Sequence, residues 1–332
     1  MPENIPPSGK LAAALLRDLL AGASVPSSDV KLPPMVGEDA GVIDIAAGAL
    51  IVSTDPITLT SKDVGAHAVA INANDVAVMG ARPRWFLAVV LLPPGTSEAE
   101  IRELFEAMHV SLMNLGVSLV GGHTEITDAV TQPVVVGQMM GLREDGEFVP
   151  TGGLSRGDAV VQVGPAPIEG SAVLAAEASG AVQTLPRDVL DVALEALHNP
   201  GISVVEAALK ATELGAIAMH DPTEGGLSAG LHELAEASGL SLRVDTDAVL
   251  WFEPGIRICK ALNLNPWGVL ASGTLLAGFP SSIVDSACHR LHLDGFSATV
   301  IAVAENGRGV RLADGTNLVR FERDELSRPL QS

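Results

Sequence analysis

The chain has 332 residues, 47% of them apolar, so it is long enough to form two ordinary domains with sizeable cores. Forty acidic residues outnumber twenty basic ones, and the formal charge of −20 opposes binding to nucleic acid and to anionic membrane surfaces. This acidity is compatible with a small polyphosphate ligand if divalent cations bridge its oxygens to carboxylates.

Cysteine usage and hydropathy indicate the compartment. Cys259 and Cys288 are too few and too isolated for a disulfide framework or a thiolate metal site. The N-terminal segment has no signal-peptide pattern, and no apolar run approaches the roughly twenty residues that a membrane span needs. We therefore expect a cytoplasmic protein that binds neither nucleic acid nor membrane.

The first predicted element is a helix over about 9–21, preceded by the segment PPSGKL. Its Gly-Lys pair suggests a phosphate loop around Lys10, but Asn4 stands where the first glycine of that motif belongs. Leu11 also replaces the required Ser or Thr. A Walker A motif is therefore excluded.

The segment 36–56 predicts two short strands joined by a glycine turn. It carries Glu38, Asp39 and Asp55 at strand ends, where carboxylates suit hard divalent cations. For Glu38 and Asp39 an ordinary polar turn is an equally good interpretation. A fold that brings these strands beside the next helix would assemble a carboxylate cluster.

That helix covers about 64–83 and carries Asp75 on an otherwise apolar stripe. The segment 63–81 contains no Lys or Arg, so an ionised Asp75 needs a distant base, a hydrogen-bond network or a metal ion. One interpretation is that Asn74 and Asp75 cap a new helical turn. The other is that Asp75 binds a metal and that Asn74, next to it, binds the cofactor.

The next predicted elements are a buried strand over 85–92 and a helix that begins after Ser97. Ser97 and Glu100 form a capping-box pattern, and Gly116 provides the C-terminal stop. This helix is expected to be scaffold.

The segment VSLVGGHTEIT (117–127) predicts a strand that runs into a turn at Gly121 and Gly122. Such a turn would let backbone approach a ligand closely before His123, Thr124 and Glu125 present their side chains. It is a candidate phosphate or metal loop, although a simple hairpin turn would also explain it. The element order β-β-α-β-α-β-β predicts a mixed α+β sandwich for the first half.

A polar, glycine-rich stretch predicts the domain boundary near 150–157, which divides the chain into 1–153 and 154–332. In the second half, HDPTEGG (220–226) joins a strand to a helix. Gly225 and Gly226 would lie at the helix N-terminus, whose free amides favour an anion. A plain capped helix start is the alternative, but it does not by itself require both glycines.

Seven motifs in order carry a resemblance to the PurM-like superfamily. This superfamily includes aminoimidazole ribonucleotide (AIR) synthetase, thiamine-monophosphate kinase, selenophosphate synthetase and the hydrogenase maturation protein HypE. The motifs are GED (37–39), STDP (53–56), NDVAVMGARP (74–83), GGHTEIT (121–127), SRGDAVVQVG (155–164), HDPTEGGL (220–227) and SGTLLAG (272–278).

The resemblance implies an α+β, two-domain fold: an N-terminal α/β domain that forms a homodimer by joining its sheet to its partner's, and a C-terminal α+β domain. It implies ATP held through Mg²⁺ in a cleft between the domains. Asp39, Asp55, Asp75 and Asp221 match the metal-binding acids of the family, and Glu38 stands where several members have the first Asp of GDD. His123 and Glu125 fall in a loop near the terminal phosphates, and Lys10 falls near a segment that in some relatives covers the nucleotide.

The family chemistry transfers the γ-phosphoryl group of ATP to an amide, selenide or phosphate oxygen. The chain ends in SRPLQS without the terminal cysteine of HypE, and it lacks the N-terminal cysteine of selenophosphate synthetases. HDPTEGGL also replaces the DISDGL-like element of thiamine-monophosphate kinases. The chain most resembles HypE-like, AIR synthase-related proteins acting on a small-molecule or protein-bound amide or phosphate; a small-molecule kinase and a non-catalytic ATP-binding dimer remain alternatives.

Overall fold

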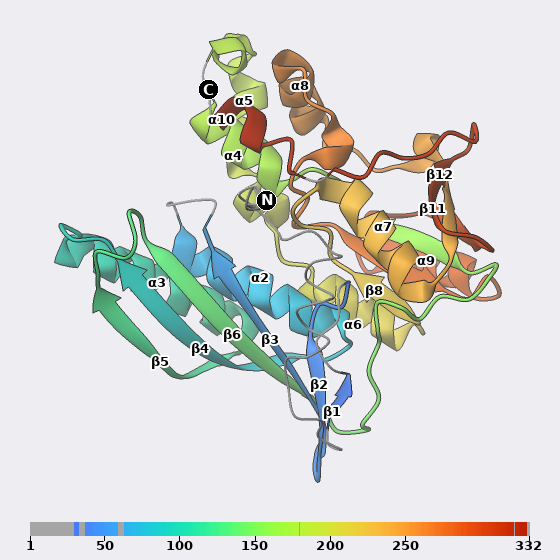
Figure 1. The fold of residues 1–332 in the computed structure, drawn as a ribbon, viewed down its shortest axis with the longest axis horizontal. Coiled ribbons are helices and arrows are strands. Elements are labelled where there is room, and N and C mark those ends of the chain that lie inside the picture. Colours follow the sequence, from blue (N-terminus) through green and yellow to red (C-terminus); the bar gives the residue numbers. More distant parts are fainter. Residues whose placement is uncertain (1–29, 33–36, 59–62, 179, 322, 331–332) are drawn as a thin grey trace, which may run out of the picture.

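The computed structural model describes residues 30–32, 37–58, 63–178, 180–321 and 323–330 (Figure 1). The expected helix over 9–21 and Lys10 lie outside the described residues. None of the described helices is long and apolar enough to span a membrane.

The first domain is built on a six-stranded sheet with the order β1-β2-β3-β6-β4-β5. Only the β4–β5 pair is parallel. The strands are β1 (Val30–Leu32), β2 (Gly41–Ile45), β3 (Gly48–Ile57), β4 (Pro83–Leu92), β5 (Ser118–Ile126) and β6 (Val134–Arg143).

One face of this sheet is covered by α2 (Val64–Val78) and α3 (Glu98–Leu115). Every second residue of β4 is buried against these helices, whereas the alternate residues are partly exposed on the other face. Figure 1 shows this other face, hereafter the outer face, turned to the viewer with both helices behind it.

The predicted limits of the α3 helix are confirmed. Ser97 accepts a hydrogen bond from the Glu100 amide, and the Glu100 side chain accepts one from the Ser97 amide, which completes the capping box. Gly116 ends the helix in the left-handed conformation.

The predicted turn at Gly121 and Gly122 is wrong, because β5 runs through both residues without interruption. A Cβ atom at position 122 would lie 2.1 Å from the Ala88 carbonyl oxygen, and Gly122 has a backbone φ angle of 150°. Gly122 is therefore explained by the close approach of β4 within the sheet rather than by a turn.

The second domain contains a sheet with the order β12-β9-β11-β7-β10-β8. Its strands are β7 (Ala159–Val163), β8 (Ala218–His220), β9 (Ser241–Val244), β10 (Leu275–Phe279), β11 (Ala298–Glu305) and β12 (Gly309–Leu312). The predicted boundary at 153/154 falls between the last strand of the first sheet and the first strand of the second.

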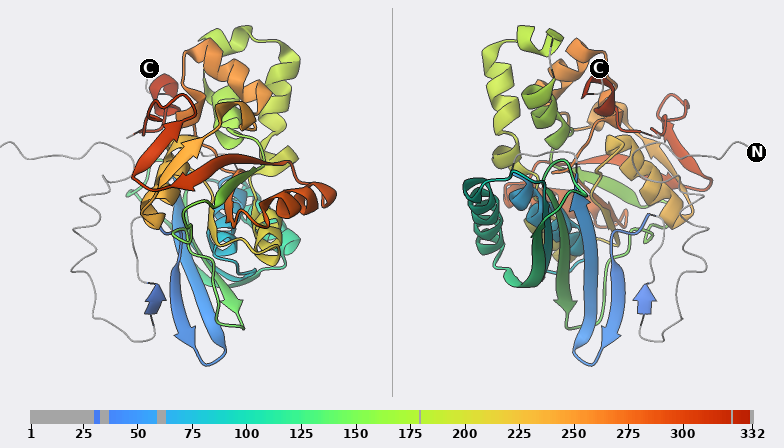
Figure 2. Two further views of the ribbon diagram at one scale, coloured as in Figure 1. Left: turned by 90° about the vertical axis from the view of Figure 1, so that its right-hand side faces the viewer. Right: turned by 60° about the vertical axis from the view of Figure 1, so that its left-hand side comes forward.

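The helices of this domain are α4 (Glu169–Glu177), α5 (Arg187–Glu195), α6 (Val205–Glu213), α7 (Gly226–Ser238), α8 (Glu253–Leu262), α9 (Val284–Leu293) and the short α10 (Ser327–Leu330). Helices α4, α5 and α8 pack together around their own apolar cluster at one end of the molecule (Figures 1 and 2). The sequence patterns did not lead us to expect α5 and α8.

Helix α2 lies between the two domains. It packs on β3 and β6 of the first domain and contacts α6 and β8 of the second. Thirteen of its fifteen residues are buried, which explains why it is apolar on all sides. Its few polar side chains therefore lie at or near the junction of the domains.

Candidate metal and nucleotide site

Asp75 lies on α2 and is only 9% exposed. Burial raises the pKa of its carboxyl group well above the usual value, and the charges of Asp221, Asp55 and Asp39 raise it further. The Ser53 hydroxyl, 2.6 Å from Oδ2, partly offsets this by donating a hydrogen bond. The charges of three acids predicted from separate motifs therefore act on Asp75, and one of these acids, Asp221, belongs to the second domain.

Asp55 is held in place through its backbone by Asn72. The Asn72 side chain accepts a hydrogen bond from the Asp55 amide at 2.8 Å and donates one to the Asp55 carbonyl at 3.1 Å. It also donates to the Ala68 carbonyl of its own helix. The Asn72 amide thus makes the two backbone hydrogen bonds that a neighbouring strand would make at Asp55. It thereby fixes β3 against α2 beside the acids.

The Asp39 carboxylate contacts side chains of the second domain and of the segment between the domains. His220 Nδ1 lies 2.7 Å from Asp39 Oδ2, and the Thr151 hydroxyl donates to the same oxygen at 3.4 Å. His220 Nε2 lies 2.9 Å from Glu233 Oε2. Burial of the ring opposes its charge, but the two carboxylates outweigh it and raise the pKa of His220 well above its usual value.

The four acids form an all-oxygen donor set of the kind that Mg²⁺ prefers. Among the described residues, no group of three or more His, Cys, Asp or Glu side chains has the arrangement to hold a metal ion by itself. Mg²⁺ is usually held by one or two carboxylates together with substrate phosphates and water. The donor set therefore fits a cation shared with a polyphosphate better than a closed protein cage.

Glu38 is bound by Thr151, the residue that also donates to Asp39. Its carboxylate accepts a hydrogen bond from the Thr151 amide at 3.2 Å. Burial raises the pKa of Glu38, and this amide partly offsets the effect. Because Glu38 is tied to the segment between the domains and is not among the charges that act on Asp75, we leave it out of the proposed metal set.

Asn74 was predicted to bind the cofactor, but its side chain joins the two domains. It donates to the Ile202 carbonyl at 2.9 Å and accepts from the Val204 amide at 2.8 Å. Both ends of this fully buried amide contact protein backbone, so a role in cofactor binding is not supported. The alternative that Asn74 and Asp75 cap a helical turn is also wrong, because α2 is continuous through both.

Gly225 and Gly226 do begin a helix, but their amides are not free for an anion. The Gly225 amide donates to Asp324 Oδ2 at 2.8 Å, and the Gly226 amide donates to the Thr223 carbonyl at 3.0 Å. A Cβ atom at Gly226 would lie 2.6 Å from the Trp267 carbonyl oxygen. The second glycine therefore has a packing explanation, and the predicted anion site is wrong for this structure.

His123 and Glu125 lie on the edge strand β5, with His123 Nε2 3.3 Å from Glu125 Oε2. His123 pairs with Val89, which belongs to the outer face, whereas Asp55 points to the opposite face, toward α2. Asp55 of β3 pairs with Gly137 of β6, which pairs with Ala88 of β4, which in turn pairs with Gly122 of β5. The two sites are therefore three strand spacings apart, about 14 Å. Within one chain, His123 and Glu125 are therefore not assembled with the acids.

The remaining residues of this predicted loop are Gly121 and Thr124. Both are exposed positions of β5, and they too are separated from the acids by the strands between β3 and β5. The prediction that they bind the nucleotide is therefore not supported within a single chain.

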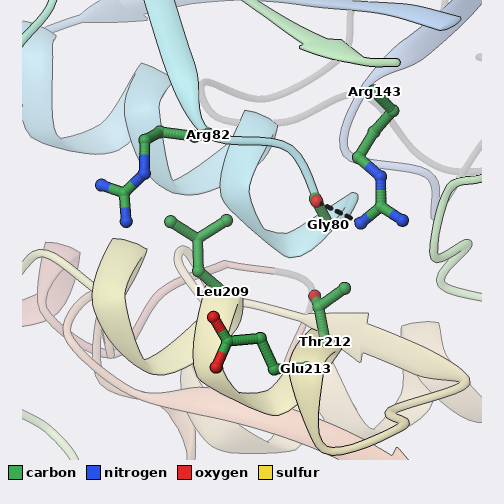
Figure 3. A pocket seen from close by; sticks show the side chains of 6 residues that line it. All are labelled: Gly80, Arg82, Arg143, Leu209, Thr212 and Glu213. Carbon is green, nitrogen blue, oxygen red and sulfur yellow. Dashed lines mark hydrogen bonds between the residues drawn. The ribbon is translucent and has the colours of Figure 1, made fainter. Parts of the chain in front are cut away.

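A surface pocket of about 390 Å³ lies between the turn after α2 and helix α6 (Figure 3). Two of its side chains are arginines, but Arg82 pairs with Glu206 at 2.8 Å and Arg143 pairs with Asp145 at 2.6 Å. Arg143 also donates to the Gly80 carbonyl, the contact drawn in Figure 3. These contacts are structural, and we assign the pocket no ligand.

Sequence reasoning missed the side chains that hold the acids in place: Ser53, Asn72, Thr151, His220 and Glu233. His220 and Ser53 lie within the motifs HDPTEGGL and STDP, so the sequence does contain a signal for these two residues. Glu233 and Thr151 are joined to the acids only by tertiary structure. No local pattern marks them.

Two family models match consecutive parts of the chain. Residues 37–143 match the N-terminal domain of AIR synthase related proteins, and residues 155–315 match the C-terminal domain of the same proteins. Together the two matches cover most of the chain.

The carbamoyl dehydratase HypE of Rhodobacter capsulatus is 29% identical over 263 residues, which cover 77% of this chain and 75% of that protein. A solved structure of HypE in complex with ATP has a TM-score of 0.71 and 23% identity, covering 88% of this chain and 92% of the other. A solved structure of ThiL with AMPPCP and TMP has a TM-score of 0.71 and 19% identity, covering 92% and 93%. At these identities the two structures show that the fold is shared.

Proposed function

Because this chain belongs to the AIR synthase-related family, we propose that it is an ATP- and Mg²⁺-dependent phosphotransferase that activates an amide or carbonyl oxygen. The observation that carries this proposal is the cluster of Asp39, Asp55, Asp75 and Asp221 at the domain junction. Similarity to the HypE carbamoyl dehydratase and to an ATP complex of HypE supports the choice of nucleotide and reaction class.

Ionising these buried acids without a counter-charge costs free energy, because burial and mutual repulsion both disfavour the ionised forms. Mg²⁺ bound with the phosphates of ATP would supply that counter-charge and neutralise the transferring phosphoryl group. Asp39, Asp55, Asp75 and Asp221 are the residues we propose for holding the cation.

The chain's own contribution is mainly positioning. The Ser53 hydroxyl orients Asp75, and Asn72 fixes the backbone at Asp55. Asp221 comes from the second domain, so the site is complete only when the two domains are docked. Asn74 maintains that docking through the backbone at Ile202 and Val204.

We further propose that the protein forms a homodimer through the outer face and the edge of β5. The outer face carries apolar side chains in the centre of the sheet, among them Val52, Val89 and Met140. The edge strand exposes Leu119, Val120 and Ile126. A second copy would cover this surface and pair with the open edge.

Such a dimer would also give His123 and Glu125 a role. They lie on the edge and outer face, so they would contact the second copy rather than the acids of their own chain. Any part they play in catalysis therefore requires the partner subunit.

A small-molecule kinase is the second candidate, favoured by the similarity to ThiL bound to AMPPCP and TMP. The two reactions differ in the fate of the acceptor oxygen. In amide activation, the amide oxygen attacks the γ-phosphorus, ADP leaves, and the oxygen departs with the released phosphate as the amide loses two protons. In a kinase reaction, the phosphoryl group stays on the acceptor.

The proposal is tested by incubating the protein with ATP, Mg²⁺ and a panel of carboxamides labelled with ¹⁸O. Amide activation predicts ADP together with ¹⁸O-labelled inorganic phosphate, and both should be absent for Asp75→Asn. A stable phosphorylated product from a parallel panel of phosphate and hydroxyl acceptors would instead establish the kinase. ATP binding without turnover on either panel would favour the non-catalytic dimer.

A further inference from the structure

His220 joins residues of both domains at the acidic cluster. It is the last residue of β8 and is 5% exposed. Its Nδ1 lies 2.7 Å from Asp39 Oδ2 of the first domain, and its Nε2 lies 2.9 Å from Glu233 Oε2 of α7. Ionised carboxylates only accept hydrogen bonds, so both ring nitrogens act as donors.

The local sequence makes room for this arrangement. Gly230 of α7 lies directly beside the ring: a Cβ atom there would be 3.3 Å from His220 Cδ2 and 2.6 Å from Pro222 Cβ. Glu233 follows three residues later, on the same side of the helix. Helix α7, which follows Asp221 in the chain, therefore makes room for the His220 ring at Gly230 and binds its Nε2 side through Glu233.

Asp39 depends on these contacts for its orientation. The hydrogen bonds that its carboxylate accepts from described side chains, those of His220 and Thr151, both reach Oδ2. Oδ1 accepts neither of these two bonds, so we take it as the oxygen offered to a cation. His220 belongs to the second domain, and Thr151 lies between the last strand of the first sheet and the first strand of the second, so the strands next to Asp39 do not by themselves set the direction of this carboxylate.

We propose that His220 is a positioning residue that holds Asp39 for the divalent cation, with Glu233 fixing the ring from the other side. This inference rests on the proposed function, because it takes Asp39 as a metal-binding residue. His220 acts through Asp39 and does not contact the cation. The second domain would thus contribute to the metal site twice, directly through Asp221 and indirectly through His220.

Two substitutions at one position separate the two bonds of the ring. The amide nitrogen of Asn lies close to the position of Nδ1, and that of Gln lies close to Nε2. His220→Asn therefore keeps a donor for Asp39 and loses the bond to Glu233, whereas His220→Gln keeps the bond to Glu233 and loses the one to Asp39. Both variants remove the same charge, so each serves as the control for the other.

The readout is the affinity for Mn²⁺, followed by electron paramagnetic resonance in the presence of a non-hydrolysable ATP analogue. Removal of a residue that orients a metal ligand typically weakens metal binding by about 10- to 100-fold. We expect a loss in this range for His220→Gln and a much smaller loss for His220→Asn. Thermal unfolding of both variants verifies that the compared proteins are folded.

Equal Mn²⁺ affinities in the two folded variants, whether both high or both low, would overturn the inference, because the bond to Asp39 would then not matter. If wild-type protein itself binds no Mn²⁺ with the analogue, the proposed function fails instead. Glu233→Gln adds a further check: it retains an acceptor for Nε2, so it should weaken Mn²⁺ binding less than His220→Gln does.

Discussion

At the scale of single residues, Asp324 shows how the C-terminal segment stabilises the second domain. Its carboxylate accepts hydrogen bonds from the amides of Gly225 and Leu326, each at 2.8 Å. Burial nevertheless raises its pKa from the usual 3.8 to about 6, because these bonds only partly offset the loss of hydration. Folding therefore favours the protonated form of this carboxyl group relative to the unfolded chain.

This shift predicts a pH dependence of stability. A carboxyl group with a raised pKa in the folded state contributes stability that is fully present below its unfolded pKa and is lost as the pH rises through about 6. A shift of about 2 pH units corresponds to at most about 3 kcal/mol. Between pH 4 and 8, the free energy of unfolding of wild type should fall relative to that of Asp324→Asn by up to this amount.

Urea denaturation of both proteins at several pH values measures this difference. Other titrating groups affect both proteins alike, so the difference between the two curves isolates Asp324. Curves that stay parallel over the whole range would show that Asp324 titrates normally in the folded state.

Part of the site was predictable from single residues. Asp39, Asp55 and Asp75 attract attention because carboxylates at strand ends or on an apolar helix are locally anomalous. In the structure the charges of Asp39, Asp55 and Asp221 all act on Asp75. Asn74 was equally anomalous, but its partners Ile202 and Val204 lie about 130 residues away in the chain. Local sequence cannot distinguish a ligand-binding amide from one that is satisfied by distant backbone.

At the scale of elements, two glycine pairs were misinterpreted: Gly225 and Gly226 at the β8–α7 junction, and Gly121 and Gly122 in β5. Both pairs follow patterns typical of ligand-binding turns. In the structure, Gly122 allows β4 to approach and Gly226 allows the 267–269 segment to approach. The capping box of α3 was predicted correctly because all of its interactions lie within four residues. The local sequence patterns contain no information about interactions between distant segments.

Helix α7 provides a matched test of this explanation for Gly226. Gly226 and Gly239 lie at opposite ends of the helix with nearly equal φ angles of 67° and 66°. A Cβ atom would meet nothing within 4 Å at Gly239, but it would lie 2.6 Å from the Trp267 carbonyl oxygen at Gly226. Gly239→Ala should cost only the backbone strain, about 1–2 kcal/mol.

Gly226→Ala should cost clearly more than Gly239→Ala, because the 267–269 backbone must move in addition. The free energies of unfolding from denaturant titrations give the comparison. Equal losses for the two variants would mean that the close approach at Gly226 has no energetic importance, and would reopen a ligand-binding explanation for this glycine.

At the scale of the whole molecule, the proposed dimer accounts for the partly exposed apolar face of the first sheet. Val89 lies on this face and pairs with Val136 and His123 of the neighbouring strands. Val89→Glu should convert the dimer to a monomer, because dimerisation would bury an unpaired charge. Val319→Glu introduces the same change at an exposed position of the second domain and should leave the dimer intact.

Sedimentation velocity at micromolar concentration measures the assembly state of wild type and both variants. We expect about twice the chain mass for wild type and Val319→Glu, and the mass of a single chain for Val89→Glu. A monomeric wild type, or a dimer that tolerates Val89→Glu, would argue against this interface.

The central claim is that the acids at the domain junction bind ATP through Mg²⁺. Its most direct test is a calorimetric titration of wild type and Asp75→Asn with a non-hydrolysable ATP analogue, with and without Mg²⁺. We expect binding that requires Mg²⁺ in wild type and is lost in Asp75→Asn while the fold remains intact. Undiminished affinity in Asp75→Asn, or no binding to wild type at all, would contradict the claim.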